Sequence, residues 1–233
     1  MQAEDRPIHF STELIHAPAR HEIPVLQKLY FELSQLRAVG YDSTDFSVPG
    51  QSRFYSRRGA KTQSIALFLP DRLVIIEEWT DIPLSDFLEK TCAVAEKAMA
   101  ALRISFFTAQ TATVRSTFAL THFDDAREFL LDRACQQTGK IAPHFGRPIA
   151  VGGLRFVLPE TPEHTGLLNV AIESFKFSRN EVLTEVKGIF AHQRIGPEDL
   201  ATATENIQAV RSFISEHVFP YLDQYDSPEE GFV

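Results

Sequence analysis

The sequence has 233 residues, 44% hydrophobic and 23% charged, an ordinary composition for a globular chain with a sizeable core. Its formal net charge of −8 repels phosphate backbones and anionic lipid unless basic side chains gather on one face, so nucleic acid is not the expected partner. No run approaches the ~18 apolar residues that span a membrane, and the first residues contain no apolar signal-peptide core. We therefore expect a cytoplasmic protein that does not enter a membrane.

The aromatic and cysteine residues are expected to pack in the core and not to form a reactive or metal-binding site. Phe is abundant, with 19 residues against five Tyr and one Trp, so most rings carry no hydrogen-bonding group and favour burial. Cys92 and Cys135 lie far apart in the sequence, which matches neither a close metal pair nor a disulfide framework. Two reduced, buried thiols are predicted.

Periodicity divides the first half into a strand, a helix, three strands and a second helix. The alternation of Ile8–Ile15 predicts a strand, and apolar residues three and four apart predict a helix from about Arg20 to Val39. Tyr41–Gly50 reads as a loop. Further strands are predicted at Gln51–Ser56, Gln63–Leu69 and Arg72–Trp79, and a helix at about Leu84–Leu102. In that helix Phe87 lies on the apolar stripe, while Glu89 and Lys90 are predicted to lie outside it.

The second half repeats this order of elements. Ile104–Leu120 predicts one long strand, or two strands broken near Ala109, and Asp124–Gln137 predicts a helix. Gly139–Pro148 reads as a loop, and the pair Gly152 and Gly153 suggests a bulge or a close backbone approach. The remaining predictions are strands at Ile149–Leu158, Leu168–Ser174 and Glu181–Phe190, a helix from Leu200 to Tyr221, and an acidic tail at Ser227–Val233.

The repeated order predicts an α+β fold built by internal duplication. Residues 1–103 and 104–226 form the two β-α-β-β-β-α units of one pseudosymmetric domain, and 227–233 the tail. This layout is similar to the saddle of the TATA-box-binding protein, in which two such units share a curved antiparallel sheet with the helices on one face. Because no sequence motif supports the resemblance, it implies topology only and no DNA-contacting residues. The alternative is a helix-grip ligand-binding fold, a curved sheet around one long C-terminal helix, against which the helix at Leu84–Leu102 counts.

The sequence contains none of the local motifs that identify common enzymes. There is no Gly-x-Ser-x-Gly, Walker loop, His-Glu-x-x-His or Gly-x-Gly-x-x-Gly. Acid–base pairs leave no local pattern, so catalysis is not excluded. We expect a protein that is not an enzyme and that uses no cofactor.

One basic and aromatic segment stands out in the acidic chain, from Arg53 to Lys61. Alternation places Arg53, Tyr55 and Arg57 on one face of a strand, where guanidinium groups could clamp an anionic group while Tyr55 stacks. The candidate ligand-binding residues are Arg53, Tyr55, Arg57, Arg58, Arg115 and Arg155, with Arg147 near the second-half strands. A solvated hairpin turn that discourages edge pairing is the favoured reading.

The acidic and histidine residues give weaker signals. Glu77, Glu78, Glu173, Glu181 and Glu185 lie in predicted strands, where ion pairs with Arg or Lys are favoured over an acid–base pair. His16 and His21, with Glu13 and Glu22 nearby, would allow a metal site, but their spacing is not diagnostic. We expect loop histidines that face water, and no metal.

More aromatic residues lie in the predicted strands than a helix-covered face can hold. They are Trp79, Phe106, Phe107, Phe156, Phe175, Phe177 and Phe190. Exposed apolar patches usually mark interfaces or ligand grooves. The expected function is therefore a non-enzymatic binding protein whose open sheet face or edge engages a protein partner or a second copy. The alternatives are a small anionic-ligand site, possibly enzymatic, at Arg53, Tyr55 and Arg57, and nucleic-acid binding.

Overall fold

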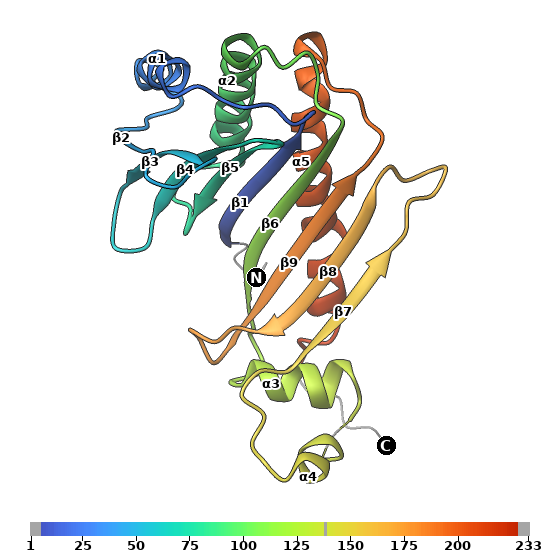
Figure 1. Cartoon of the computed structure of the whole chain (residues 1–233). Helices are drawn as coiled ribbons and strands as arrows, with labels where there is room; N and C mark the ends of the chain where they lie inside the picture. The colour runs from blue at the N-terminus through green and yellow to red at the C-terminus, as the bar shows by residue number, and fades with distance from the viewer. Residues whose placement is uncertain (1–5, 138, 228–233) are drawn as a thin grey trace.

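The computed structural model describes residues 6–137 and 139–227, and its strands form one open sheet with helices packed on it (Figure 1). The strands are β1 (Arg6–Ile15), β2 (Ser43–Asp45), β3 (Ser52–Arg57), β4 (Gln63–Leu69), β5 (Arg72–Glu78), β6 (Ala109–Ala119), β7 (Gly153–Leu158), β8 (Leu167–Ser174) and β9 (Glu181–Phe190). The α-helices are α1 (Ile23–Ser34), α2 (Leu84–Leu102), α3 (Ala126–Glu128), α4 (Ile141–Phe145), α5 (Leu200–Phe213) and α6 (Phe219–Asp223).

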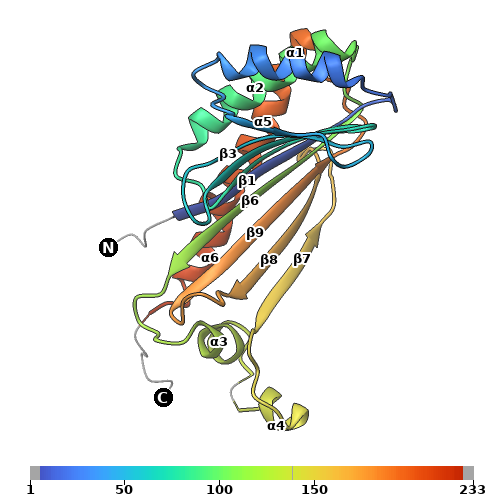
Figure 2. The same cartoon turned by 60° about the vertical axis from the view of Figure 1, so that its left-hand side comes forward.

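The strands of the described chain form a nine-stranded antiparallel sheet in the order β2-β3-β4-β5-β1-β6-β9-β8-β7. The first strands of the two halves, β1 and β6, pair at its centre, with Phe10 opposite Val114. Figure 2 shows the sheet curving, with α1, α2 and α5 on one side of it. The predicted α+β class is confirmed.

Alternation in the sequence decides which side chains face the helices. In β1, Phe10 and Leu14 are completely buried, whereas Ser11 and Glu13 between them are partly exposed. Successive side chains of a strand point to opposite faces, so the buried set lies under the helices and the other set lines the open face.

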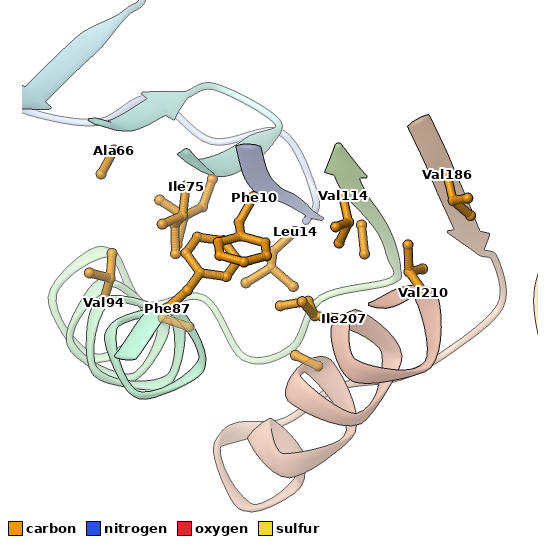
Figure 3. Packing of buried hydrophobic residues seen from close by; sticks show 14 of the residues in the cluster. Phe10, Leu14, Ala66, Ile75, Phe87, Val94, Val114, Val186, Ile207 and Val210 are labelled. Carbon is orange, nitrogen blue, oxygen red and sulfur yellow. The ribbon is translucent and has the colours of Figure 1, made fainter. Parts of the chain in front are cut away.

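The core lies between the sheet and the helices α2 and α5 (Figure 3). Phe87 of α2 stacks on Phe10 of β1, with ring centroids 5.4 Å apart, and Ile207 and Val210 of α5 pack beside Val114. Full burial of each such side chain stabilises the fold by about 1.5–3 kcal/mol relative to an exposed position. The two long helices therefore hold both halves of the sheet on one core.

Several predicted boundaries are wrong, for local reasons. The first helix spans Ile23–Ser34, shorter than the predicted Arg20–Val39, because Pro24 occupies its first turn and the chain leaves the helical path at Leu36. The predicted helix Asp124–Gln137 is the short α3 followed by a π-helical turn at Phe129–Ala134. The loop Gly139–Pro148 contains α4, and the loop Tyr41–Gly50 contains β2.

Two strands of the second half are also shorter than predicted, whereas β9 has its predicted bounds, Glu181–Phe190. A single strand, β6, covers only Ala109–Ala119 of the predicted Ile104–Leu120, and β7 begins at Gly153. The C-terminal helix includes a π-helical turn at Ile214–Val218 before Pro220, which has no N–H to donate. Most of the predicted tail lies outside the described residues.

The structure also bears on the predictions for the two cysteines and for membrane crossing. Cys92 and Cys135 are free thiols, and both are partly buried. None of the described helices is both long enough and apolar enough to cross a membrane.

Candidate functional sites on the open face and the edge of the sheet

The predicted arginine cluster is only partly brought together. On β3, Arg53 and Arg57 lie over the ring of Tyr55, their guanidinium carbons 4.7 and 5.9 Å from its centroid. Arg53 also donates from Nη2 to Gln63 Oε1 at 3.2 Å. These three side chains share the open face, as alternation predicts.

Arg58 belongs to a different site. It lies two residues after buried Ser56, so the alternation of β3 continues onto the helix-covered side and brings Arg58 to buried Glu77. Its Nη2 lies 2.7 Å from Glu77 Oε2 and 2.7 Å from Asp81 Oδ1. Arg58 is therefore committed to these two carboxylates and does not join Arg53 and Arg57.

Arg115 and Arg155 lie well away from β3. Arg115 stands opposite Glu185 at the centre of the sheet and pairs with it, while Arg155 on β7 pairs with Glu173 at 3.1 Å. Six strands separate β3 from β7 in the sheet order. The arginines thus form separate ion pairs, and the preference for carboxylate–arginine pairs across strands is confirmed for Glu173 and Glu185.

A hydrogen-bonded chain crosses the middle of the open face. His9 donates from Nδ1 to Glu78 Oε2 at 2.7 Å, and its Nε2 lies 2.9 Å from Ser11 Oγ. The hydrogen bond from His9, and the charges of His9 and Arg115, lower the pKa of Glu78. Serine, imidazole and carboxylate follow one another here in the order of a catalytic nucleophile, its general base and the group that orients that base.

The hydrogen-bonded series of Ser11, His9 and Glu78 lacks an oxyanion hole, the second requirement for acyl transfer. An oxyanion hole needs free donors near the serine, commonly backbone N–H groups. Ser11 lies in the middle of β1, which is hydrogen-bonded to β5 on one side and to β6 on the other. Its neighbouring backbone donors are therefore already used, and the chain acts as a polar tie between β1 and β5.

An aromatic cluster closes one end of the open face. The rings of Trp79, Phe175 and Phe177 lie 5.4–6.2 Å apart, and Lys61 Nζ lies 4.7 Å from the Trp79 ring and 4.6 Å from the Phe177 ring. Trp79 has a left-handed backbone, with φ of 48°, which is unusual for a bulky residue. The cluster joins the β3–β4 turn to the β8–β9 turn, which sequence reasoning did not anticipate.

Of the phenylalanines in the predicted strands, some are buried and others are exposed. Phe107, Phe175 and Phe190 are buried, whereas Phe156 is 41% exposed. On β7, Val157 is 63% and Leu158 is 38% exposed. These residues form the apolar part of an edge strand.

Within residues 6–137 and 139–227, the strand β7 (Gly153–Leu158) pairs only with β8, so its other side has no partner strand there. Phe156 and Leu158 face the helix side, where no described helix covers them fully, and Val157 faces the open side. The opposite edge is protected because β2 has only three residues. Exposed, apolar edge strands are templates for pairing with another strand.

Comparison of the chain with protein-family models and with curated protein sequences gives no match.

Proposed function

We propose that this protein is a non-enzymatic interaction protein that pairs with a second copy of itself through the free side of β7. The observation that carries the proposal is the exposure of apolar side chains on both faces of this edge strand. Natural edge strands are usually protected by charge, shortness or cover. Only Arg155, whose side chain is 79% exposed, supplies charge within β7.

The backbone of β7 has free hydrogen-bonding groups at alternate positions. Ser174 donates its N–H to Gly152 O, which makes these residues a hydrogen-bonded pair of the β7–β8 ladder. Hydrogen-bonded and non-hydrogen-bonded pairs alternate along antiparallel strands. The N–H and C=O groups of Gly153, Arg155 and Val157 therefore point away from β8.

These groups restrict how two copies can pair. Side chains directly opposite each other must share a face, and the hydrogen-bonded pairs must use Gly153, Arg155 and Val157. Pairing Arg155 with its own counterpart would oppose like charges. We propose a register that avoids this, with Phe156 opposite Phe156 of the second copy and Arg155 opposite its Val157.

The charges on either side of β7 support the same antiparallel arrangement. Exposed Glu160 and Glu163 follow the strand, and exposed Arg147 precedes it. In the proposed register, the acidic segment of one copy runs beside the basic segment of the other. A two-fold axis repeats every contact, so the attraction between the acidic segment of one copy and the basic segment of the other occurs twice in the dimer.

Light scattering after size-exclusion chromatography of the full chain tests the proposal. The wild type is expected to run at about twice 26.3 kDa. Val157→Pro removes an outward N–H without affecting the β8 ladder and should give a monomer. Val48→Ser, which changes a residue that is 49% exposed elsewhere, should remain a dimer. A monomeric wild type, or a dimer unaffected by Val157→Pro, would overturn the proposal.

Cross-linking tests the register. Non-hydrogen-bonded pairs have Cα atoms about 4.5 Å apart, within disulfide range. Phe156→Cys should therefore form a covalent dimer under mild oxidation, and Arg155→Cys should form little. Equal cross-linking of both variants would contradict the register and leave the dimer itself intact.

We also propose that the chain consists of two duplicated units, 1–103 and 104–226, in a saddle similar to that of the TATA-box-binding protein. The strand order supports this, because β3-β4-β5-β1 in one half corresponds to β7-β8-β9-β6 in the other, with β1 and β6 adjacent. An experimental structure in which α2 and α5 do not superpose when the two halves are aligned would contradict the duplication.

We infer a cytoplasmic location. The support is that Cys92 and Cys135 are free thiols, as expected in a reducing compartment. Thiol labelling in intact cells, followed by fractionation, is expected to find both reduced in the cytoplasmic fraction. Recovery in an oxidising compartment would count against this inference.

A second candidate function is binding of a small anion at Arg53, Tyr55 and Arg57. Among the described residues, no salt bridge uses Arg53 or Arg57; Arg53 donates only to the neutral Gln63 side chain, so both positive charges remain available to a ligand. Titration with inorganic phosphate should show binding that Arg57→Ala weakens and Arg155→Ala does not. Phosphate binding that Arg57→Ala leaves unchanged would exclude this site.

A further inference from the structure

Two histidines that are close in sequence meet at the end of β1. His16 directly follows this strand, and His21 lies just before α1. Their ring centroids are 5.7 Å apart, with the ring planes inclined by 38°. His16 is only 4% exposed, so the expectation that both face water is wrong for His16.

The hydrogen bond of His16 determines which nitrogen carries its proton. Nδ1 lies 2.8 Å from Ala17 O, and because a carbonyl can only accept, Nδ1 is the donor. In the neutral ring, Nε2 then holds a free lone pair. A backbone carbonyl that fixes the tautomer in this way is common for histidines that bind metals.

The Nε2 atoms of His16 and His21 are both buried, and neither has a hydrogen-bond partner in the described structure. A buried polar atom without a partner costs about 1–3 kcal/mol, so two neighbouring ones suggest a missing partner.

We propose that His16 and His21 bind one late first-row transition-metal ion, such as Zn²⁺ or Cu²⁺, between their rings. Two metal–nitrogen bonds of about 2 Å that meet at a roughly tetrahedral angle place the centroids of two imidazole rings roughly 5–6 Å apart, which includes the observed 5.7 Å. Neutral imidazole is a preferred ligand for these ions.

The rest of the coordination shell would come from solvent or from an added ligand. Within residues 6–137 and 139–227, no group of three or more His, Cys, Asp or Glu side chains could hold a metal ion. His21 also lines the groove between α1 and the β2–β3 region, a cavity of about 920 Å³ that includes Arg20, Glu22 and Phe46. The ion would therefore have open positions, unlike a closed structural site.

A buried water bridging the two rings is the competing explanation, since such waters satisfy orphaned polar atoms. Calorimetric titration of the full chain, first treated with a chelator, separates the two. We expect one Zn²⁺ or Cu²⁺ per chain, with Cu²⁺ bound more tightly. His16→Ala and His21→Ala should each weaken binding by at least about tenfold. His144→Ala, which removes an exposed histidine, should not change it.

Electron paramagnetic resonance of the Cu²⁺ complex provides a readout that does not depend on affinity. The wild type should show coupling to two imidazole nitrogens, and each single variant should show coupling to one. Circular dichroism should show that the variants remain folded. Absence of stoichiometric binding, or binding unchanged in both variants, would overturn the proposal and favour the bridging water.

Discussion

Lys90 of α2 and Glu77 of β5 form an ion pair inside the core, with Nζ 2.6 Å from Oε1 and side-chain exposures of 3% and 0%. Ser64 lies 2.9 Å from the same Nζ, and Arg58 binds the other oxygen of Glu77. The prediction that Lys90 lies outside the apolar stripe of its helix is therefore wrong. The helix buries Lys90 because β5 places a carboxylate beneath it.

Breaking this pair should strongly destabilise the protein. Lys90→Met leaves the Glu77 carboxylate buried with less compensation and is expected to lower the free energy of unfolding by about 3–5 kcal/mol. The double variant Glu77→Leu with Lys90→Met should recover much of the loss. Urea unfolding followed by circular dichroism measures both, with Lys28→Met, at a residue whose side chain is 81% exposed, as the control. A loss no larger than that of the control would contradict this role.

Tyr41 should make stability sensitive to alkali. The residue is 2% exposed, and its buried hydroxyl makes no hydrogen bond of good geometry in the described structure, although Ser64 is close enough to oppose the rise of its pKa. Burial, and then the charge of Glu77, raise the pKa of Tyr41. The folded state thus holds the phenolic proton more tightly than the unfolded state. This contribution is fully present below the ordinary tyrosine pKa of about 10 and is lost as the pH rises above it.

Tyr41→Phe tests this effect, because it removes both the unpaired hydroxyl and its ionisation. Stability at pH 7 should change little or increase slightly. Between pH 10 and about 11.5, the variant should lose less stability than the wild type. The partly exposed Tyr55 provides the control through Tyr55→Phe. Parallel alkaline curves for the wild type and Tyr41→Phe would refute the prediction.

Asp125 should contribute to stability against acid. Its Oδ1 accepts from the backbone N–H of Arg127 at 2.9 Å, and its Oδ2 lies 3.2 Å from Arg179 Nε. The side-chain hydrogen bond from Arg127 is the main reason that the pKa of Asp125 is well below its usual range. The stabilisation is present above the ordinary aspartate pKa of about 3.9 and is lost as the pH falls through the lowered value.

Asp125→Asn should cost about 1–3 kcal/mol at pH 7, because hydrogen bonds to a charged acceptor are lost. The difference from the wild type should shrink as the pH falls below about 4. Unfolding midpoints measured from pH 7 to pH 2.5 give the comparison, with the exposed Asp223→Asn as the reference. A constant difference across this range would rule out the proposed ionisation.

Gly188 of β9 is required by the approach of α5 to the sheet. A Cβ at this position would lie 2.7 Å from Val210 Cγ2 and 2.7 Å from Phe190 Cε2, both on buried side chains. Gly188→Ala should therefore cost about 1–3 kcal/mol through overpacking. Gly59→Ala, in an exposed turn with no atom closer than 3.8 Å, should have little effect. Thermal unfolding of both variants decides the question.

Prediction from sequence succeeds where one local pattern is strong. The bounds of β4 and α2 are as predicted, because a short apolar run ended by Pro70 and Asp71 marks the strand and a clear apolar stripe marks the helix. Alternation also places Arg53, Tyr55 and Arg57 on one face. It fails for the predicted helix Asp124–Gln137, where the chain forms a π-helical turn that the apolar spacing does not reveal.

The candidate sites depended more on the tertiary structure. Sequence reasoning listed Phe156 among the surplus aromatic residues but had no means of finding that β7 is an edge, because strand order depends on contacts between distant segments. It also considered His16 and His21 together. The burial of His16 against Phe107, and the unpaired Nε2 atoms of both rings, depend on the tertiary structure.

The sequence by itself determined the α+β class and, for most strands, which side chains share a face. These properties follow from periods of two and 3.6 residues, which are local. The tertiary structure decided that β1 and β6 meet, that Lys90 is buried against Glu77, and that β7 has a free side. Each depends on which distant segments become neighbours, and burial and electrostatics take their values only from those neighbours.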